Sequence, residues 1–329
     1  MSAIDIPRVS VVIPVYNGEK TIAETIESVL AQSLQDFELI VINDGSTDKT
    51  LEVIASFHDP RLRVLSYPNA GLSASRNRGI QQASGEYISF IDADDLWTPD
   101  KLETQAEALA TRPEAAVAYS WTDLIDQSSQ FLAPDSRAQW SGNVYPHILL
   151  GSFPASGSNV LVRRSAFQVV GGFDESLKSA EDWEMWIRLA ARYPFVVVPK
   201  AQILYRIAPG SMSTQLDRQE AESLKVIERA FQQAPGNLQY LKSRSLGNLY
   251  KYLTSRALDN YQSQRALVFF WKAVRHDPSL AKHRITTKVL FKSLALVLLP
   301  TPLAGATFAR MGQWANTKTL LGYISLEVD

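Results

Sequence analysis

The sequence predicts an α/β fold, with a mostly parallel mixed sheet of the Rossmann-like, nucleotide-binding kind and a helical C-terminal extension. Short β-branched runs alternate with helical segments through the first part of the chain. Carboxylates directly follow two of these runs, at the sheet edge where open α/β sheets bind ligands. From about Gln215 the character becomes helical. We therefore expect an α/β domain over residues 1–214 and a helical region over residues 215–329.

The first elements form a β-α-β-α-β series, which is typical of parallel strands joined by right-handed crossovers. Strands are expected at Val9–Val15, Phe37–Ile42 and Leu62–Ser66, and helices at Glu19–Ala31 and Lys49–Phe57. No G-x-G-x-x-G or G-x-x-x-x-G-K-[ST] motif occurs, so neither a dinucleotide dehydrogenase nor a P-loop enzyme is supported.

Two polar features follow the second and third strands. Asp44 comes just after the second strand, and an ionised Asp can accept the imide N–H of a uracil ring. An Asx-turn that closes the loop explains Asp44 equally well. The next helix carries Arg76 and Arg78 among small residues after Gly71. An Arg fork suits a diphosphate, whereas surface Arg on a solvated helix is the plainer alternative.

Three carboxylates end the next strand, Glu86–Ile91: Asp92, Asp94 and Asp95. Their mutual repulsion is relieved by protonation or by a cation. Oxygen ligands suit a hard ion such as Mg²⁺ or Mn²⁺. In the alternative interpretation Asp94 or Asp95 is the N-cap of a helix that begins near Pro99.

The remaining elements are predicted with less detail. We expect strands at Glu114–Ser120 and Val160–Arg163, an irregular stretch at Thr122–Tyr145, and helices at Trp183–Tyr193, Glu220–Gln233, Leu238–Leu258 and Gln262–His276. Small residues that include Ser156 and Gly157 precede the second of these strands and could line a groove. Trp121, Trp140, Trp183 and Trp186 are candidates for stacking on a ligand, although core packing is the ordinary role of Trp.

Composition narrows the class of protein. The 329 residues carry a net charge of −1, which argues against nucleic acid as the main partner. The absence of Cys excludes a disulfide scaffold and a zinc-thiolate site and fits a cytosolic chain. No signal peptide is recognisable. We therefore expect a cytoplasmic protein that does not bind nucleic acid.

Taken in order, the motifs resemble family 2 inverting glycosyltransferases of the GT-A fold. The resemblance rests on Val11–Asn17, Val41–Asp48, Asn69–Gly79, Gly85–Asp95, Gly171–Glu175, Ala180–Glu184 and Leu204–Arg206. It implies transfer of a sugar, with inversion, from a nucleoside diphosphate sugar (a UDP-sugar by expectation) to an acceptor hydroxyl. The acceptor would be a glycan or a lipid-linked molecule of envelope or extracellular polysaccharide or glycolipid synthesis.

The resemblance also implies roles for single residues. Asp182 would be the general base, and Glu181 would hold the acceptor or raise the basicity of Asp182. Asp94 and Asp92 would hold Mg²⁺ or Mn²⁺, with Asp94 the more direct ligand. The nucleotide side would comprise Pro14, Val15, Tyr16, Glu19, Asp44, Arg76, Asp92 and Ala93, and the acceptor side Trp183, Ser156 and Gly157. In the plainer interpretation Glu181 and Asp182 complement the dipole of the helix that they begin.

One position departs from the family pattern, because Ala208 stands where relatives often have His. Metal binding would then rest mainly on Asp94, the diphosphate and water, which is common for Mg²⁺. Arg206, Ser211 and Ser213 could still hold the diphosphate.

The tail leaves two alternatives open. Between Lys242 and Lys292 the only acids are Asp259 and Asp277, and the uncharged, Pro-broken stretch 293–309 follows. A basic helical region beside an apolar segment suits peripheral contact with the anionic inner face of the plasma membrane. A soluble cap or a homo-oligomer interface explains it about as well.

Two other functions compete with metal-dependent glycosyl transfer. A catalytically inactive GT-A-like module would only bind a nucleotide sugar, and the presence of Asp44, Asp92, Asp94 and Asp182 argues against it. A nucleotidyltransferase would normally carry a Gly-rich, basic loop after the first strand, where this chain has Tyr16–Glu19.

Overall fold

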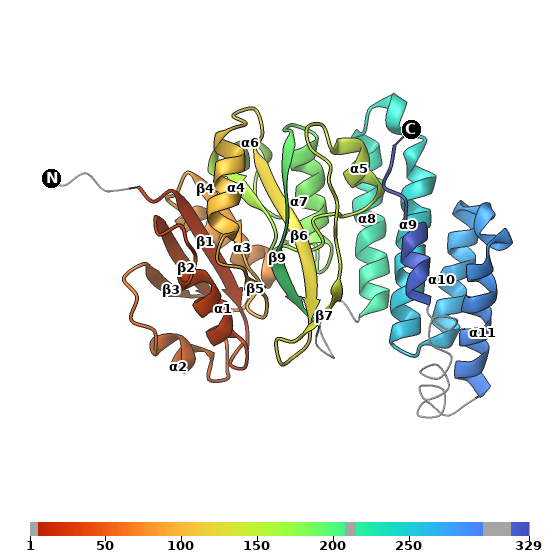
Figure 1. Cartoon of the computed structure of the whole chain (residues 1–329), viewed down its shortest axis with the longest axis horizontal. Helices are drawn as coiled ribbons and strands as arrows, with labels where there is room; N and C mark the ends of the chain where they lie inside the picture. Colours follow the sequence, from red (N-terminus) through yellow and green to blue (C-terminus); the bar gives the residue numbers. More distant parts are fainter. Residues whose placement is uncertain (1–5, 208–214, 299–316, 329) are drawn as a thin grey trace. The chain divides into compact units, whose positions relative to one another are not determined.

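The computed structural model describes residues 6–207, 215–298 and 317–328. The chain divides into two compact units (Figure 1). The first comprises Met1–Tyr145 and Ser152–Ala208, and the second comprises Pro146–Gly151 and Pro209–Asp329. The second unit therefore includes a short segment from the middle of the α/β sequence as well as the helical tail.

A mixed sheet forms the centre of the first unit. Its strands, among the described residues, are β1 (Val9–Val15), β2 (Phe37–Asn43), β3 (Leu62–Ser66), β4 (Tyr87–Phe90), β5 (Leu96–Trp97), β6 (Val117–Ile125), β7 (Phe131–Pro134), β8 (Leu161–Arg163) and β9 (Phe195–Arg206). Their order is β3-β2-β1-β4-β8-β6-β9-β5, and β7 pairs with β6. The pairs among β1 to β4 are parallel, whereas β8 runs antiparallel to both neighbours. The mostly parallel mixed sheet predicted from the sequence is confirmed.

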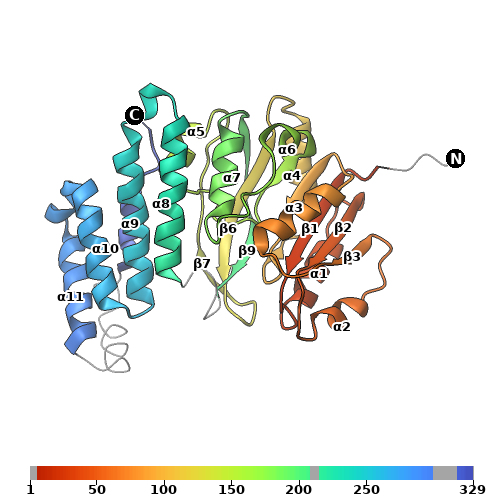
Figure 2. The same ribbon diagram turned by 180° about the vertical axis from the view of Figure 1, so that it is seen from behind.

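Helices cover both faces of this sheet. On one face, α1 (Ile22–Leu30) and α4 (Lys101–Ala110) contribute to one buried cluster with the strands (Figure 1). On the other face lie α3 (Leu72–Gln82), α6 (Arg164–Val170) and α7 (Glu181–Ala190) (Figure 2). There the ring of Phe90 meets Phe173 edge-on, and Phe173 meets Trp186 in the same way. Helix α3 approaches β1 closely at Gly79, where a Cβ would lie 2.9 Å from Cγ2 of Val12.

The middle of the chain is more regular than the sequence predicts. The expectation of an irregular stretch over Thr122–Tyr145 is wrong for its first half, because β6 continues to Ile125 and β7 follows it, whereas residues 135–144 form no helix or strand apart from an isolated bridge at Gly142. Strand β9 was not predicted at all. Pro199 and polar neighbours interrupt its β-branched run, and the pairing of β6 with β9 shifts register on both sides of Trp121. A bulged strand has no clean period of two, so pattern analysis misses it.

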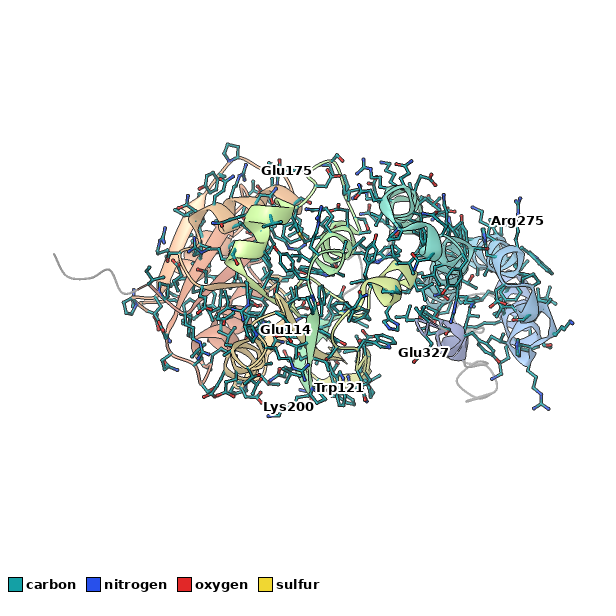
Figure 3. All side chains as sticks on the ribbon, turned by 90° about the horizontal axis from the view of Figure 1, so that it is seen from above. Glu114, Trp121, Glu175, Lys200, Arg275 and Glu327 are labelled. Carbon is teal, nitrogen blue, oxygen red and sulfur yellow. The ribbon has the colours of Figure 1, made fainter. Side chains whose placement is uncertain are left out.

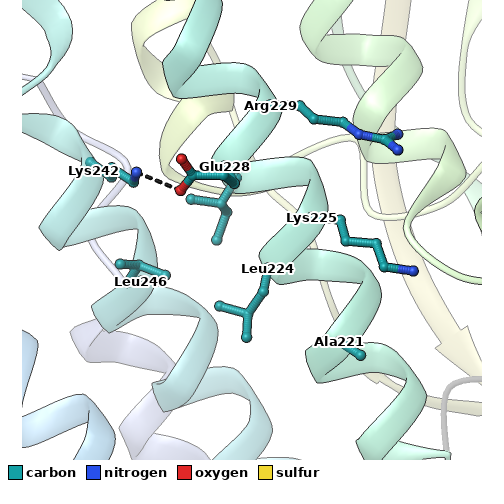
Figure 4. Close-up of a pocket in the computed structure, with 8 residues that line it drawn as sticks. Ala221, Leu224, Lys225, Glu228, Arg229, Lys242 and Leu246 are labelled. Carbon is teal, nitrogen blue, oxygen red and sulfur yellow. Dashed lines mark hydrogen bonds and ion pairs between the residues drawn. The ribbon is translucent and has the colours of Figure 1, made fainter.

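The second unit is helical, as predicted. It contains α8 (Leu216–Gln233), α9 (Leu241–Asp259), α10 (Ser263–His276) and α11 (Arg284–Leu298), with most of α5 (Tyr145–Leu150) and a short 3₁₀ helix at Thr317–Tyr323. The amide of Asn248 joins three of its segments by donating to the carbonyls of Leu150 and Ser325. Helices α8 and α9 border a pocket of about 520 Å³, crossed at its rim by a Lys242–Glu228 ion pair of 2.6 Å (Figure 4).

No helix in the described part of the chain is both long and apolar enough to cross a bilayer.

Candidate functional site

The loops that follow β1 and β2 are joined at the carboxyl edge of the sheet. The backbone N–H of Gly18 donates to Thr50 Oγ1 (2.8 Å), and the Glu19 carboxylate accepts the N–H of Lys49 (3.0 Å). A Cβ on Gly18 would lie 3.6 Å from that of Ala93, so the loop after β4 borders the same place. Glu19 and Ala93 thus lie where the sequence places the nucleotide, at an edge typical of ligand binding.

Three further predicted donor-side residues end strand β1. Pro14 and Val15 are buried in the strand and offer a ligand only their backbone. The Tyr16 ring is 55% exposed. An exposed aromatic ring at this edge is a surface on which a nucleobase can stack.

Asp44 is buried and organises a loop distant in sequence. Its carboxylate accepts the N–H groups of Ala70 and Gly71, at 2.8 to 3.2 Å, and the Arg78 guanidinium at 2.9 Å. The Asx-turn alternative is therefore wrong for Asp44, and within its own loop the amide oxygen of Asn43 accepts the N–H of Ser46. Asp44 therefore fixes the backbone that opens α3.

Each carboxylate after β4 has its own environment. Asp92 is paired with Arg76 (2.7 Å), and Asp95 is wholly buried, where it accepts from Ser158 Oγ and from the N–H of Arg206. Asp94 is partly exposed between them. Burial, with added repulsion from Asp92, raises the pKa of Asp94 to about 6, and burial raises that of Asp95 well above its usual value.

The N-cap interpretation of Asp94 and Asp95 is wrong. The short strand β5 follows them directly, and the N-cap residue of α4 is Asp100. Asp95 instead fastens the acidic loop to two neighbouring segments of the first unit through Ser158 and Arg206. The acidic cluster is therefore a loop held in place by long-range hydrogen bonds, and it does not begin a helix.

Arg206 binds the acidic loop in this structure. The sequence suggests a contact with the diphosphate instead. Its Nε donates to the carbonyl of Asp94 (2.7 Å), and its Nη2 is paired with Glu24 (2.8 Å). Nη1 reaches Ser129 Oγ and two carbonyls of the turn after β6. Each of its three guanidinium nitrogens thus has a partner within the first unit. Ala208, Ser211 and Ser213, named with it above, lie outside the described residues.

Arg76 joins the acidic loop to the start of α7. Its side chain is buried, with Nη2 on Asp92 at 2.7 Å and Nη1 on Glu181 at 2.9 Å. Its guanidinium carbon lies 5.3 Å from the centre of the Phe173 ring. Burial alone would lower the pKa of Arg76, but Asp92, Glu181 and Asp182 raise it above its usual value. One buried cation thus holds carboxylates from two loops that are far apart in sequence.

The two residues that follow Arg76 hold two further loops. Asn77 is bound in both directions to the backbone of Phe173, at 2.7 and 2.9 Å, and Arg78 is bound to Asp44. The alternative of a solvated helix with surface Arg is therefore wrong for Arg76 and Arg78. Three consecutive residues of α3 thus bind four segments around one place, at Asp44, Asp92, Phe173 and Glu181.

Asp182 lies beside this cluster in the first turn of α7. Glu181 is buried against Arg76, whereas Asp182 is partly exposed and accepts the N–H of Trp183 (2.7 Å). Burial, followed by repulsion from Glu181, raises the pKa of Asp182 to about 7, although Arg76 lowers it. A carboxylate that titrates near neutrality can accept a proton at working pH.

The three residues predicted for the acceptor side are all buried. Trp183 and Ser156 are buried, so neither offers an open stacking or binding face. Gly157 lies directly against the Arg76 guanidinium. Sequence analysis missed Ser158 and Asn77, because a Ser or Asn in a loop carries no periodic signal that reveals a long-range partner.

We expect Gly157→Ala to destabilise the protein by about 1–3 kcal/mol, the typical cost of overpacking. The new Cβ would lie 2.8 Å from Cζ of Arg76, and the guanidinium cannot retreat without losing Asp92 or Glu181. Denaturant unfolding measures the change. The matched control is Gly236→Ala, whose Cβ would meet nothing within 4 Å. Equal stability of the two variants would contradict a fixed guanidinium.

The described residues contain no group of three or more His, Cys, Asp or Glu arranged to hold a metal ion by themselves. Asp94 and Asp92 lie close enough for their charges to repel, and Asp94 is partly exposed. A protein-only metal cage is therefore not the expected mode of binding at this edge.

Comparisons with known proteins concern the family and the fold. A family model described as "Glycosyltransferase like family 2" matches residues 10–256. An uncharacterized glycosyltransferase of Rickettsia typhi is 38% identical over 189 residues, 55% of this chain and 58% of the relative. The chondroitin synthase of Pasteurella multocida is 29% identical over 269 residues, 79% of this chain and 27% of the synthase. The chain thus spans little more than half the length of these relatives, or less.

Two solved structures are similar in fold. The mannosyltransferase PcManGT from Pyrobaculum calidifontis, in complex with GDP-Man and Mn²⁺, has a TM-score of 0.60 and 18% identity, and the match covers 97% of this chain and 84% of that one. S. aureus TarS 1–349 in complex with UDP-GlcNAc has a TM-score of 0.57 and 19% identity, covering 84% and 92%. At such identities the likeness concerns the fold.

Proposed function

The chain belongs to glycosyltransferase-like family 2 and has the GT-A fold, and from this premise we propose that it transfers a sugar, with inversion, from a nucleoside diphosphate sugar to an acceptor hydroxyl. The observation that carries the proposal is the Arg76 bridge from Asp92 to Glu181. Glycosyl transfer needs charge stabilisation on the leaving-group side of the anomeric carbon and a base on the other. The bridge brings the acidic loop, where a bound cation could stabilise the leaving diphosphate, next to the helix start that carries Asp182, the proposed base.

In the proposed reaction Asp182 takes the proton of the acceptor hydroxyl as the acceptor oxygen bonds to the anomeric carbon. The bond from that carbon to the nucleoside diphosphate breaks in the same step, and the diphosphate leaves with its electron pair. A single displacement inverts the carbon and requires no covalent intermediate. The pKa of about 7 supports Asp182 in this role, because burial and then Glu181 keep its carboxylate basic.

For the donor we propose a UDP-sugar. Tyr16 would stack on the base, and Asp44 would receive the imide N–H in place of its bond from Arg78. The names of the structural neighbours include both UDP-GlcNAc and GDP-Man, so the test must include both bases. The similarity to a chondroitin synthase supports a polysaccharide acceptor.

A divalent cation fits the residues of the acidic loop. Asp94 is partly exposed, and the repulsion from Asp92 that raises its pKa to about 6, after burial, would be relieved by a cation. Because no protein-only cage exists among the described residues, the diphosphate and water would complete the shell, as is usual for Mg²⁺. When bound, Mg²⁺ or Mn²⁺ would stabilise the charge of the leaving diphosphate. We assign this chemistry to residues 1–214, with 215–329 as an appended helical region.

We expect a nucleotide sugar with Mn²⁺ or Mg²⁺ to raise the melting temperature. At a hundredfold excess over Kd, binding adds about 2.7 kcal/mol, which is roughly 5–10 °C for a domain of this size. Thermal unfolding with a panel of UDP- and GDP-sugars, with and without a chelator, measures the effect. Asp94→Ala should abolish the metal-dependent part. The control Asp36→Ala removes an exposed carboxylate before β2, at the other edge of the sheet, and should keep it.

The same panel decides between the proposed functions. Release of nucleoside diphosphate that depends on Asp94 supports the enzyme. Stabilisation by a nucleotide sugar without any diphosphate release, over a range of acceptors, would favour an inactive binding module. No stabilisation by any nucleotide sugar would overturn the proposal.

A further inference from the structure

Helices α10 and α11 expose large apolar side chains that the second unit does not use in its core. On α11, Leu294 and Val297 are 56% and 57% exposed, and Leu290 is also exposed. On α10, Val268 and Trp271 are each 54% exposed. Helices α10 and α11 pack on each other. Single exposed apolar residues are ordinary, but a group on two adjoining helices indicates an interaction surface.

The exposed residues of α11 form one stripe. Leu290, Leu294 and Val297 follow a spacing of four and three residues, which aligns them along one side of a helix. Ile285, Val289 and Ser293 are buried on an adjoining side of the helix. The stripe is therefore a second apolar face of α11. The buried side chains of the helix already pack it onto the second unit, so the stripe is not needed for folding.

Positive charge accompanies this stripe. Residues 263–298 contain seven Lys and Arg but a single acid, Asp277, which is paired with Lys251 of α9 (2.9 Å). Arg265 and Lys272 of α10 are paired with acids of α8. Arg275 (labelled in Figure 3), Lys282 and Arg284 are exposed at or near the ends of α10 and α11. The region thus presents an apolar stripe on α11, with exposed cations at and before the start of that helix.

These features select one class of partner. A second copy that used the same surface would offer apolar side chains, but residues 263–298 hold no acid for the cations apart from Asp277, which is already paired with Lys251. Nucleic acid would meet the cations but leave the stripe exposed to water. An anionic bilayer accepts both, because phosphates pair with cations and the acyl boundary accepts apolar side chains. A Trp on the neighbouring helix is typical of a protein at that boundary.

We propose that the α11 stripe (Leu290, Leu294 and Val297) docks on an anionic phospholipid bilayer, lying in its interface. Arg275, Lys282 and Arg284 contact the headgroup phosphates. The docking would hold the protein at a lipid surface without spanning it. It does not depend on the proposed sugar transfer, since none of its residues belongs to the candidate site.

Flotation of the full chain with phospholipid vesicles tests the proposal. We expect binding to phosphatidylcholine vesicles that contain about one-third phosphatidylglycerol, weak binding to pure phosphatidylcholine, and release at high salt. The variant Leu294→Asp/Val297→Asp should bind the anionic vesicles at least about tenfold more weakly. The control Val169→Asp alters an equally exposed residue of α6 in the first unit and should bind as the parent does.

A variant with reversed charges tests whether the stripe binds lipid or another partner. Lys282→Glu/Arg284→Glu should also weaken binding to the anionic vesicles, and circular dichroism should show all variants folded, since every altered residue is exposed. Absence of vesicle binding, or binding that Leu294→Asp/Val297→Asp leaves unchanged, would overturn the proposal. So would a concentration-dependent dimer that this variant abolishes, because the stripe would then bind a second copy. No nucleotide sugar is present, so failure here leaves the proposed function untouched.

Discussion

Replacing Asp182 by Asn is expected to lower the rate of sugar transfer by roughly 10²–10⁴-fold, the typical contribution of a general base. Asn keeps the shape of Asp and the hydrogen bond from the N–H of Trp183, but it cannot take a proton. Binding of the nucleotide sugar, measured by thermal shift, should remain. Retained transfer would remove Asp182 from the base role.

The pH dependence of kcat/KM provides a second test of Asp182 as the base. Burial, and then repulsion from Glu181, raises the pKa of Asp182 to about 7, and only the ionised form can act as base. The acid limb of kcat/KM should therefore fall as pH drops through about 7. A raised carboxyl pKa also means that the ionised group destabilises the fold as pH rises from the ordinary Asp value toward 7. Asp182→Asn should thus unfold no earlier than the parent at pH 8, and a purely structural residue would not behave so.

Two neighbouring carboxylates provide a matched comparison. Glu181→Gln removes a charge that raises the pKa of Asp182, so the acid limb should move to lower pH. Glu184→Gln alters the same helical turn, but Glu184 is paired with Arg188, and its removal should leave the limb in place. Identical profiles for both variants would contradict the coupling between Glu181 and Asp182.

The edge of the sheet could be predicted because its signals are local. A β-branched run followed by Asp44, or by Asp92 and Asp94, places those residues at strand ends whatever the rest of the chain does. The strands β1, β2 and β4 lie adjacent and parallel, so the two acidic loops meet at one edge. Because the strands are parallel, residues that follow different strands in the sequence come close together in space.

What could not be predicted is which side chains meet across elements. Asp95 looked like a cap because its sequence neighbours allow one, yet Ser158 and Arg206 bind it from far along the chain. Arg76 contacts Asp92 as well as Glu181, which is 105 residues away. Such contacts depend on side-chain reach and burial, which the chemical type of a residue does not encode.

Replacing Arg76 by Met should destabilise the protein by roughly 3–5 kcal/mol, because it leaves two carboxylates without their buried counter-ion. The lower part of that range is expected, since Asp92 is 26% exposed and water shields it partly. Arg76→Lys should fall in between, because an ammonium lacks the planar fork that reaches Asp92 and Glu181 together. The control Arg63→Met breaks an exposed pair with Glu38 and should cost at most about 1 kcal/mol. Denaturant unfolding measures all three.

The cause of that loss can be isolated by removing the charges that Arg76 neutralises. Arg76→Met combined with Asp92→Asn and Glu181→Gln buries no unpaired charge, so most of the stability should return. Activity should not return, because the triple variant lacks Asp92 as well as the cation. In Arg76→Met alone, loss of a cation that lowers the pKa of Asp182 should move the acid limb of kcat/KM to higher pH, opposite to Glu181→Gln. Stability that stayed low in the triple variant would show that Arg76 acts through packing on Phe173 and Gly157 and not through its charge.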